Sequence, residues 1–407
     1  MFDPSSLRRQ FPIFEHPIGK SPLVYLDSAA TAQKPQAVLD AMRTFYETQN
    51  GNAHRGMHVL AERATLAYEN ARATVQKFLG AASPAEIVFT KNATEAINLV
   101  ARTWARANGQ ADRVALTLLE HHSNIVPWMQ RKEELGTAID WIDVDEAGRI
   151  RMDELEQTLA AGKTTLLAIT GLSNVLGTVT NLVKAIRLAH DAGALVLVDA
   201  SQLIAHAPVD IVDLDCDFLT FSGHKLFGPL GIGVLYGKKD LLEAMPPFLG
   251  GGTMIQSVTT SGFVPGDVPQ RFEAGTQPVA EAVGLAAAID WFSSLDPVEI
   301  RAHESMLLAK AVAGLRALPG VTVLGPADAS VAGCVSFVAD GAHPHDLTEI
   351  VGRNGVCLRA GHHCAEPLHH RLGIPASTRL SVAPYNTEED IDIALSEIAA
   401  ALKKLRG

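Results

Sequence analysis

The sequence predicts an α/β protein whose mostly parallel sheet is covered by helices on both faces. Three observations support this prediction. Strand-length apolar runs alternate with amphipathic segments, a length of 407 residues suits two domains, and the alternation of strand-like and helix-like segments is interrupted after residue 250. Strands that alternate with helices of this length form βαβ units. We therefore expect a large domain over 22–294 and a smaller α+β domain over 295–407, to which residues 1–21 are added.

The elements of the large domain follow one another in a regular order. Apolar runs predict strands at 86–90, 113–118, 138–142, 165–170, 194–198, 218–221 and 233–236. Amphipathic stretches predict helices at 35–49, 62–79, 94–107, 124–135, 152–160 and 181–192. The segment 250–270 is rich in Gly, Thr and Pro and predicts a long loop, and a helix is expected at 279–293.

The same patterns continue in a different order in the second domain. A helix is expected at 297–317, and two more at 345–354 and 388–404. Strands are expected at 321–324, 331–338, 356–359 and 378–382. Strands and helices in this mixed order predict a small α+β unit packed against the first domain.

Composition excludes several classes of function. The formal net charge is −11 and no run of Lys and Arg occurs, so nucleic acid is not expected as a partner. The longest apolar runs have only the length of a strand, so no membrane association is expected. The first ten residues mix Asp3 with Arg8 and Arg9 and lack an apolar signal core. Four cysteines without a CxxC pair fit a reducing cytoplasm, where we expect the protein to act.

One cysteine stands apart from the others. Cys216, Cys334 and Cys357 lie in apolar runs, where a thiol is usually a small buried side chain. Cys364 instead follows Gly361-His362-His363, and a nearby imidazolium or guanidinium lowers the pKa of a thiol. Cys364 is therefore a candidate nucleophile, with an inert half-buried thiol as the alternative.

A second candidate nucleophile lies on a turn of small residues. Lys225 ends Ser222-Gly223-His224-Lys225, whose hydroxyl, imidazole and amides could meet a phosphate. Asp199 ends a buried strand and could hold a pyridine nitrogen protonated, and Gln202 could reach a phenolic oxygen. With Cys364, these residues predict pyridoxal phosphate (PLP) chemistry on a sulfur-bearing substrate. Considered alone, Lys225 would more often be a charged residue on the surface. Asp199 could equally well be the N-cap of a helix.

Two loops after other strands add polar groups. Asn92-Ala93-Thr94 opens a helix whose amides, with the Thr94 hydroxyl, could hold a phosphate or could be an ordinary cap. His122 follows another strand and could stack on a flat ring and move protons, or lie on the surface. No metal is expected, because adjacent histidines rarely point at one ion and no acid–histidine helix pattern occurs.

Together these motifs resemble the group II (SUF/CSD-type) cysteine desulfurases of the class V aminotransferase superfamily. The resemblance covers nearly the whole chain, and its most specific motifs run from Ser222 to Lys225, from Arg271 to Thr276 and from Arg359 to Ala365. The short interval between Arg359 and Cys364 resembles this group more than group I, whose cysteine lies on a longer loop. The resemblance implies the PLP-dependent transferase fold type I, with a seven-stranded sheet in the large domain, and a homodimer.

The resemblance also implies a role for each matching residue. Lys225 is expected to bind the cofactor covalently, Asp199 to pair with its ring nitrogen, Gln202 to meet its phenolic oxygen and His122 to stack on its ring. The expected phosphate ligands are Thr94, Ser222 and His224, with Thr276 from the second subunit. The expected substrate contacts are His54, Asn174, Arg359 and Arg379.

The activity so implied is conversion of L-cysteine to L-alanine through a persulfide on Cys364. The sulfur would pass to an acceptor protein of the SufE/CsdE or SufU kind for iron–sulfur cluster assembly. Alternatives are selenocysteine lyase activity on L-selenocysteine, another PLP-dependent reaction such as transamination, epimerisation or kynurenine cleavage, and a silent scaffold. Two departures from the pattern of these enzymes occur: Ser201 stands where alanine is common, and Gln277 stands between Thr276 and Pro278, where proline often follows directly.

Overall fold

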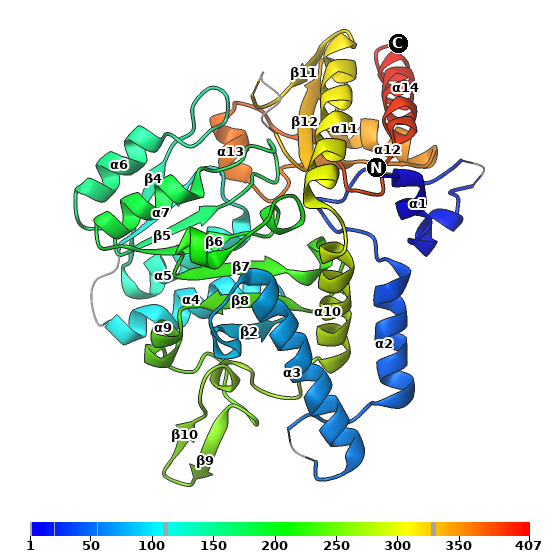
Figure 1. Ribbon diagram of the computed structural model, residues 1–407. Coiled ribbons are helices and arrows are strands. Elements are labelled where there is room, and N and C mark those ends of the chain that lie inside the picture. The colour runs from blue at the N-terminus through cyan, green and yellow to red at the C-terminus, as the bar shows by residue number, and fades with distance from the viewer. Residues whose placement is uncertain (1, 20, 55, 109–112, 327–330) are drawn as a thin grey trace.

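The chain folds into two packed parts, each built around its own sheet, as Figure 1 shows. The structure is a computed structural model, and it describes residues 2–19, 21–54, 56–108, 113–326 and 331–407. Both the N-terminal and the C-terminal segments lie with the smaller part, near α12 (Pro344–Arg353) and α14 (Glu388–Leu405). The alternating pattern of the sequence thus corresponds to one large and one small structural unit.

The large sheet has seven strands in the order β2-β8-β7-β6-β5-β3-β4. Only β8 runs antiparallel to its neighbours, so the prediction of a mostly parallel sheet is confirmed. Each predicted strand lies within one or two residues of an observed one. The strands are β2 (Ile87–Thr90), β3 (Arg113–Thr117), β4 (Ala138–Ile142), β5 (Leu166–Thr170), β6 (Leu195–Asp199), β7 (Phe218–Ser222) and β8 (Gly233–Gly237).

Helices cover both faces of this sheet because most of its strands are apolar on both sides. Val88 and Leu197 pack into one core, while Phe89 and Val198 pack into the other. The first face carries α4 (Ala93–Asn108), α5 (Val126–Leu135) and α9 (Lys239–Ala244). The second carries α2 (Gln36–Thr48), α3 (Val59–Leu79), α6 (Met152–Ala160), α7 (Leu182–Asp191) and α10 (Val279–Ser293).

The small sheet has four strands in the order β11-β12-β15-β14, and every pairing in it is antiparallel. Its strands are β11 (Val321–Val323), β12 (Cys334–Ala339), β14 (Arg359–Gly361) and β15 (Ser377–Ser381). Its helices are α11 (Pro297–Ala317), α12 (Pro344–Arg353), α13 (Glu366–Arg371) and α14 (Glu388–Leu405). Within the ranges given above, no helix is both long enough and apolar enough to span a membrane.

Two predictions about extended segments are wrong. The expected loop over 250–270 contains a hairpin of β9 (Ile255–Thr259) and β10 (Gly262–Pro265), which projects away from the sheet in Figure 1. Val258 and Phe263 are exposed, so no buried face produced the usual alternation of apolar and polar residues. The single strand expected at 356–359 divides into β13 (Val356–Cys357) and β14, which pair with different partners.

The N-terminal segment extends further into the small part than expected. β1 (Val24–Tyr25) pairs in parallel with β13, and Leu26 packs into the small core with Leu380. We therefore propose that the large domain begins near residue 27, not at residue 22. The boundary at 294–295, between α10 and α11, we propose unchanged.

A buried ion pair joins the two parts at a second place. His206 follows β6 and its short 3-10 turn, and its Nδ1 lies 2.9 Å from Glu304 Oε2 on α11. Both side chains are less than a tenth exposed. Burial alone lowers the pKa of His206, but the charge and hydrogen bond of Glu304 outweigh it and raise that pKa above the ordinary value. The pair therefore stabilises the packing of the two parts while His206 is protonated.

We expect a pH-dependent loss of stability when His206 is changed to Gln. Because the folded-state pKa is raised, the contribution is complete below the unfolded value of about 6.5 and disappears as pH rises through the folded-state pKa. The thermal midpoint of wild type should exceed that of His206→Gln more at pH 6 than at pH 9. Changing the exposed His16 to Gln is the control. A midpoint difference that does not vary with pH would contradict the assignment.

Candidate active site

One cavity of about 620 Å³ lies at the carboxyl ends of five strands of the large sheet. Loops that follow β2, β3, β5, β6 and β7 supply its floor, and residues of the small part supply the opposite wall. Ligands of open α/β sheets bind at this edge, where successive loops converge. Lys225 and Cys364, which are 139 positions apart in the sequence numbering, line this same cavity.

Lys225 reaches the cavity because the chain turns sharply after β7. The segment Gly223–Lys225 forms one 3-10 turn, and the amides of Leu226 and Gly228 both donate to the Gly223 carbonyl oxygen. Burial lowers the pKa of Lys225 from its ordinary value; the Asp199 carboxylate opposes this, and the Arg379 guanidinium adds to it. A lysine with a lowered pKa has a larger share of the free amine, the form that attacks a carbonyl carbon.

Asp199 and Gln202 lie on the cavity floor beside Lys225. Asp199 is buried, and its Oδ1 accepts a hydrogen bond from the Ser201 amide at 2.9 Å. Gln202 is also buried, and its Nε2 donates to the Ala29 carbonyl oxygen at 2.8 Å, which fixes the amide plane. A carboxylate and an oriented amide in these positions can pair with a protonated ring nitrogen and a neighbouring oxygen.

The residues expected to hold a phosphate gather at the N-terminus of α4. Thr94 lies in the first turn of this helix, and its Oγ1 is 2.7 Å from Ser123 Oγ. The Ser222 hydroxyl accepts from the Ala93 amide at 2.9 Å and keeps its own proton for an anion. His224 has a buried Nδ1 without a hydrogen-bond partner. Helix amides, hydroxyls and an unpartnered imidazole nitrogen fit a phosphate.

The surroundings of two adjacent histidines favour His121 over the predicted His122 as the stacking residue. His122, the predicted stacking residue, lines the cavity but uses its Nε2 to accept from the Glu366 amide at 3.0 Å. His121 is the imidazole whose environment Lys225 influences: burial lowers its pKa to about 3, and the charge of Lys225 adds to this. Its Nδ1 accepts from the Ser123 amide at 3.1 Å, so the proton of the neutral ring is on Nε2. We propose His121 as the stacking residue.

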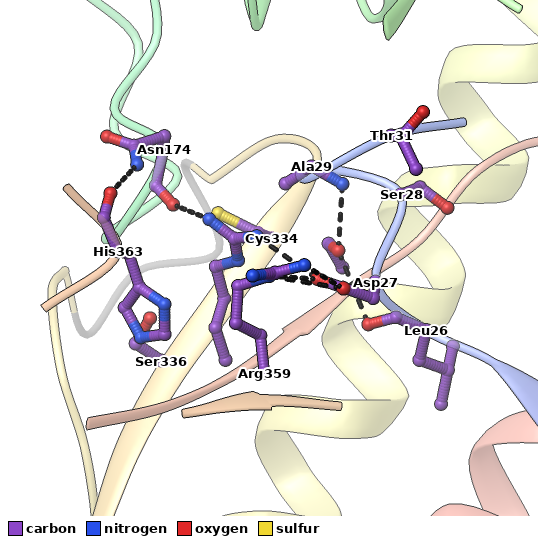
Figure 2. A network of polar contacts seen from close by, with 12 residues as sticks. Leu26, Asp27, Ser28, Ala29, Thr31, Asn174, Cys334, Ser336, Arg359 and His363 are labelled. Carbon is purple, nitrogen blue, oxygen red and sulfur yellow. Dashed lines mark hydrogen bonds and ion pairs between the residues drawn. The ribbon is translucent and has the colours of Figure 1, made fainter. Parts of the chain in front are cut away.

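Cys364 is held at the cavity by two contacts from the large part. Its carbonyl oxygen accepts from the His122 amide at 2.6 Å. The preceding carbonyl, of His363, accepts from Asn174 Nδ2 at 2.6 Å, as Figure 2 shows. Cys364 is exposed, whereas Cys216 and Cys334 are buried and Cys357 is half-buried. It is thus the thiol that solvent and a ligand in the cavity can reach.

Two arginines of the cavity wall share one carboxylate. Arg359 pairs with Asp27 through Nε at 3.0 Å and Nη2 at 2.8 Å, and Figure 2 shows its guanidinium pointing at that carboxylate. Arg379 Nη2 lies 3.2 Å from Asp27 Oδ1, and its Nη1 donates to the Asn174 carbonyl oxygen at 2.9 Å. Two positive charges against one negative charge leave a net positive charge, which suits a substrate carboxylate.

We expect Asp27→Asn to destabilise the fold. The Arg379 side chain is only 3% exposed, so removing the carboxylate leaves a buried charge without its ion-pair partner. The expected loss is about 2–4 kcal/mol, below the full cost of breaking a buried pair because Arg359 can turn to solvent. Urea unfolding measures it. Asp40→Asn, which removes an exposed pair with Arg43, should change stability by less than about 0.5 kcal/mol. Equal midpoints for Asp27→Asn and wild type would refute the expectation.

Two predicted site residues do not reach the cavity of this chain. His54 is exposed, and its Nε2 lies 3.2 Å from Glu69 Oε1. Thr276 is exposed and does not line the cavity.

In the described part of the chain, no three His, Cys, Asp or Glu side chains are grouped to hold a metal ion. Sequence reasoning assigned no role to Asp27.

Comparison with known proteins finds one family model, and relatives and a solved structure that are described as cysteine desulfurases. The family model described as aminotransferase class-V matches residues 24–394. The chain is 45% identical to a cysteine desulfurase of Synechococcus elongatus over its full length, spanning 64% of that longer protein. It is 44% identical to a probable cysteine desulfurase of Streptomyces coelicolor, covering 96% of this chain and 95% of that one. The crystal structure of the cysteine desulfurase CsdA from Escherichia coli matches with a TM-score of 0.91 and 40% identity over 99% of both chains.

Proposed function

This chain belongs to the class V aminotransferase family and, within it, to the group II cysteine desulfurases, and on that premise we propose that it converts L-cysteine to L-alanine with PLP as cofactor. The observation that carries the proposal is the meeting of the Lys225 amine and the Cys364 thiol in one cavity. An amine alone serves many PLP reactions, but the added thiol suits transfer of a sulfur atom.

The cavity fits the cofactor in charge and in hydrogen bonding. Thr94, Ser222 and His224 would hold its phosphate, Asp199 its ring nitrogen, and Gln202 its phenolic oxygen. The His121 imidazole is neutral because burial lowers its pKa to about 3, and it would stack on the face of the cofactor's pyridine ring. When bound, the cofactor supplies an electron sink for the bonds at the substrate's α-carbon.

The chain's own residues bind the substrate and move its protons. Arg379 and Asn174 would bind the carboxylate of L-cysteine, since both line the cavity and the Arg379 guanidinium donates to the Asn174 backbone carbonyl oxygen. Lys225 Nζ, whose pKa is lowered by burial, would take the α-proton and hold it within reach of the substrate carbons. A base positioned in this way contributes about 10²–10⁴-fold to the rate.

Cys364 then accepts the sulfur atom. Its thiolate attacks the substrate sulfur, a new S–S bond forms, and the bond between that sulfur and the β-carbon breaks. The electron pair of the broken bond stays with the carbon, which takes up a proton and leaves as L-alanine. No external oxidant is needed, because the two electrons that the two sulfur atoms lose in forming the S–S bond reduce the β-carbon. The product on the protein is a persulfide at Cys364.

The proposal is tested by incubating the purified, PLP-loaded protein with L-cysteine and a reductant. Sulfide and L-alanine should appear in equal amounts. Alanine without sulfide release, or pyruvate with ammonia, would place the protein among other PLP enzymes. A parallel assay with L-selenocysteine measures the alternative, selenocysteine lyase activity, by the ratio of the two kcat/KM values.

Two partners complete the proposal. A second copy of the chain would form a homodimer, which is supported by exposed apolar side chains of α2 and α3 such as Tyr46, Val59 and Leu66. In this dimer Thr276 and His54 could serve the partner's cavity. A sulfur acceptor of the SufE/CsdE or SufU kind would take the persulfide sulfur from the exposed Cys364 toward iron–sulfur cluster assembly in the cytoplasm.

A further inference from the structure

The two residues at the tip of the Cys364 loop have a costly backbone conformation. His363 has φ of 51° and Cys364 has φ of 56°, so two consecutive residues with side chains are left-handed. This conformation costs an L-residue other than glycine roughly 1–2 kcal/mol. Such a conformation persists only where the surroundings hold it. The loop therefore needs anchors, and the contacts of His122 and Asn174 act only on its backbone.

A side-chain anchor lies behind the loop in the small part. Ser377 Oγ, on β15, is 3.0 Å from His363 Nε2 and 3.0 Å from His369 Nε2. All three residues are buried, Ser377 and His369 completely. One serine hydroxyl thus joins the loop to helix α13, on which His369 lies.

The direction of each hydrogen bond follows from one backbone carbonyl. His369 Nδ1 lies 3.0 Å from the Ala365 carbonyl oxygen, which can only accept, so the His369 proton is on Nδ1. Burial lowers the pKa of His369 and lowers that of His363 to about 2, so both rings are neutral. His369 Nε2 must then accept from the Ser377 hydroxyl, whose oxygen accepts from His363 Nε2–H. A residue without a hydroxyl at position 377 breaks both bonds.

The chain of bonds leaves His363 with a bare Nδ1. This nitrogen is buried and has no hydrogen-bond partner, so it contributes nothing to holding the ring. The ring is consequently fixed through Nε2, by Ser377. Because the ring and the left-handed backbone belong to the same residue, loss of this bond frees His363 to relax and to carry Cys364 with it.

We propose that Ser377 is a positioning residue for Cys364: through its hydrogen bond to His363 it maintains the left-handed turn that presents the thiol to the cavity. Ser377 does not line the cavity, so it acts on the thiol and not on the substrate. This inference rests on the proposed function for the role of Cys364, but the anchoring itself can be measured without turnover.

The test compares Ser377→Ala with Ser377→Thr, which keeps the hydroxyl. Hydrogen exchange of the peptide that spans residues 360–368 is measured by mass spectrometry, because the Ala365 and Glu366 amides are bonded within the loop and to His122. We expect exchange there to be about tenfold faster in Ser377→Ala, and close to wild type in Ser377→Thr. Ser377→Cys, a weaker acceptor of nearly the same size, replaces the alanine variant if that variant does not fold.

Kinetics distinguish this role from a general structural one. In Ser377→Ala, kcat for sulfide release should fall by about 10–100-fold while KM for L-cysteine changes by less than about threefold. The spectral response of the bound cofactor to L-alanine should be retained, because the cofactor residues are untouched. The control is Thr103→Val, which removes another buried hydroxyl, bonded to the Leu99 carbonyl oxygen at 2.7 Å. It should leave both loop exchange and kcat unchanged.

Unchanged loop exchange in Ser377→Ala would overturn the proposal, and so would a loss of the L-alanine response together with turnover. Failure of the proposed function is recognised separately, since wild-type protein would then release no sulfide. In that case faster loop exchange in the variant would still support Ser377 as the anchor of the turn.

Discussion

Replacing Lys225 with Ala is expected to abolish turnover of L-cysteine and the covalent attachment of PLP. Lys225 supplies an amine whose pKa burial lowers, and it is the lysine among the residues that line the cavity. Without it the α-proton has no base, which alone costs at least about 10²–10⁴-fold in rate. The wild-type protein should absorb as a PLP enzyme, and borohydride should fix the cofactor's mass on the peptide that contains Lys225. The variant should show neither the absorbance band nor the adduct.

A second lysine with a lowered pKa provides the matched control. Burial lowers the pKa of Lys34 to about 7, and its Nζ donates to the carbonyl oxygens of Ala32 at 2.5 Å and His224 at 3.1 Å. It therefore has the reactivity for an adduct but lacks access to the cavity. In Lys34→Met the borohydride adduct should remain on Lys225. An adduct on Lys34, or a coloured Lys225→Ala protein that still releases sulfide, would contradict the assignment.

The sequence alone could predict most strands and helices around the site, because runs of buried apolar residues mark these elements. The strand at 138–142 and the helices at 152–160, 279–293 and 297–317 have the predicted bounds. Parallel strands also bring their carboxyl ends together, so Asp199 and Lys225 could be placed at one edge before any coordinates. The bounds of these elements and the edge of the sheet at which the site lies were therefore predictable from the sequence.

The remainder depends on orientation and on distant contacts. His121 and His122 are adjacent in a loop, and no periodicity states which ring faces Lys225. The pair of Asp27 with Arg359 joins residues 332 positions apart, and neither carries a local signal of the other. The hairpin of β9 and β10 has exposed side chains on both strands, so it lacks the alternation that marks a half-buried strand.

Replacing Cys364 with Ser should leave the cofactor chemistry intact and remove sulfur transfer. Cys364 is exposed at the cavity wall, whereas the residues that would hold PLP lie on the cavity floor, so absorbance and the spectral response to L-cysteine should persist. Holding a thiolate near the substrate sulfur replaces a collision with a step inside one complex, and its loss should lower sulfide release by at least about 10³-fold. In wild type, brief exposure to substrate should add the mass of one sulfur atom to the Cys364 peptide.

Cys357 is the matched control for this variant. It is a half-buried thiol on β13, seven positions away, its pKa is raised by burial, and it does not line the cavity. Cys357→Ser should therefore keep full turnover and the sulfur adduct on Cys364. Sulfide release at the wild-type rate by Cys364→Ser would mean that sulfur leaves the substrate without a protein carrier. The Lys225 amine would then be sufficient for the chemistry, and the left-handed turn that brings Cys364 to the cavity would need a different explanation.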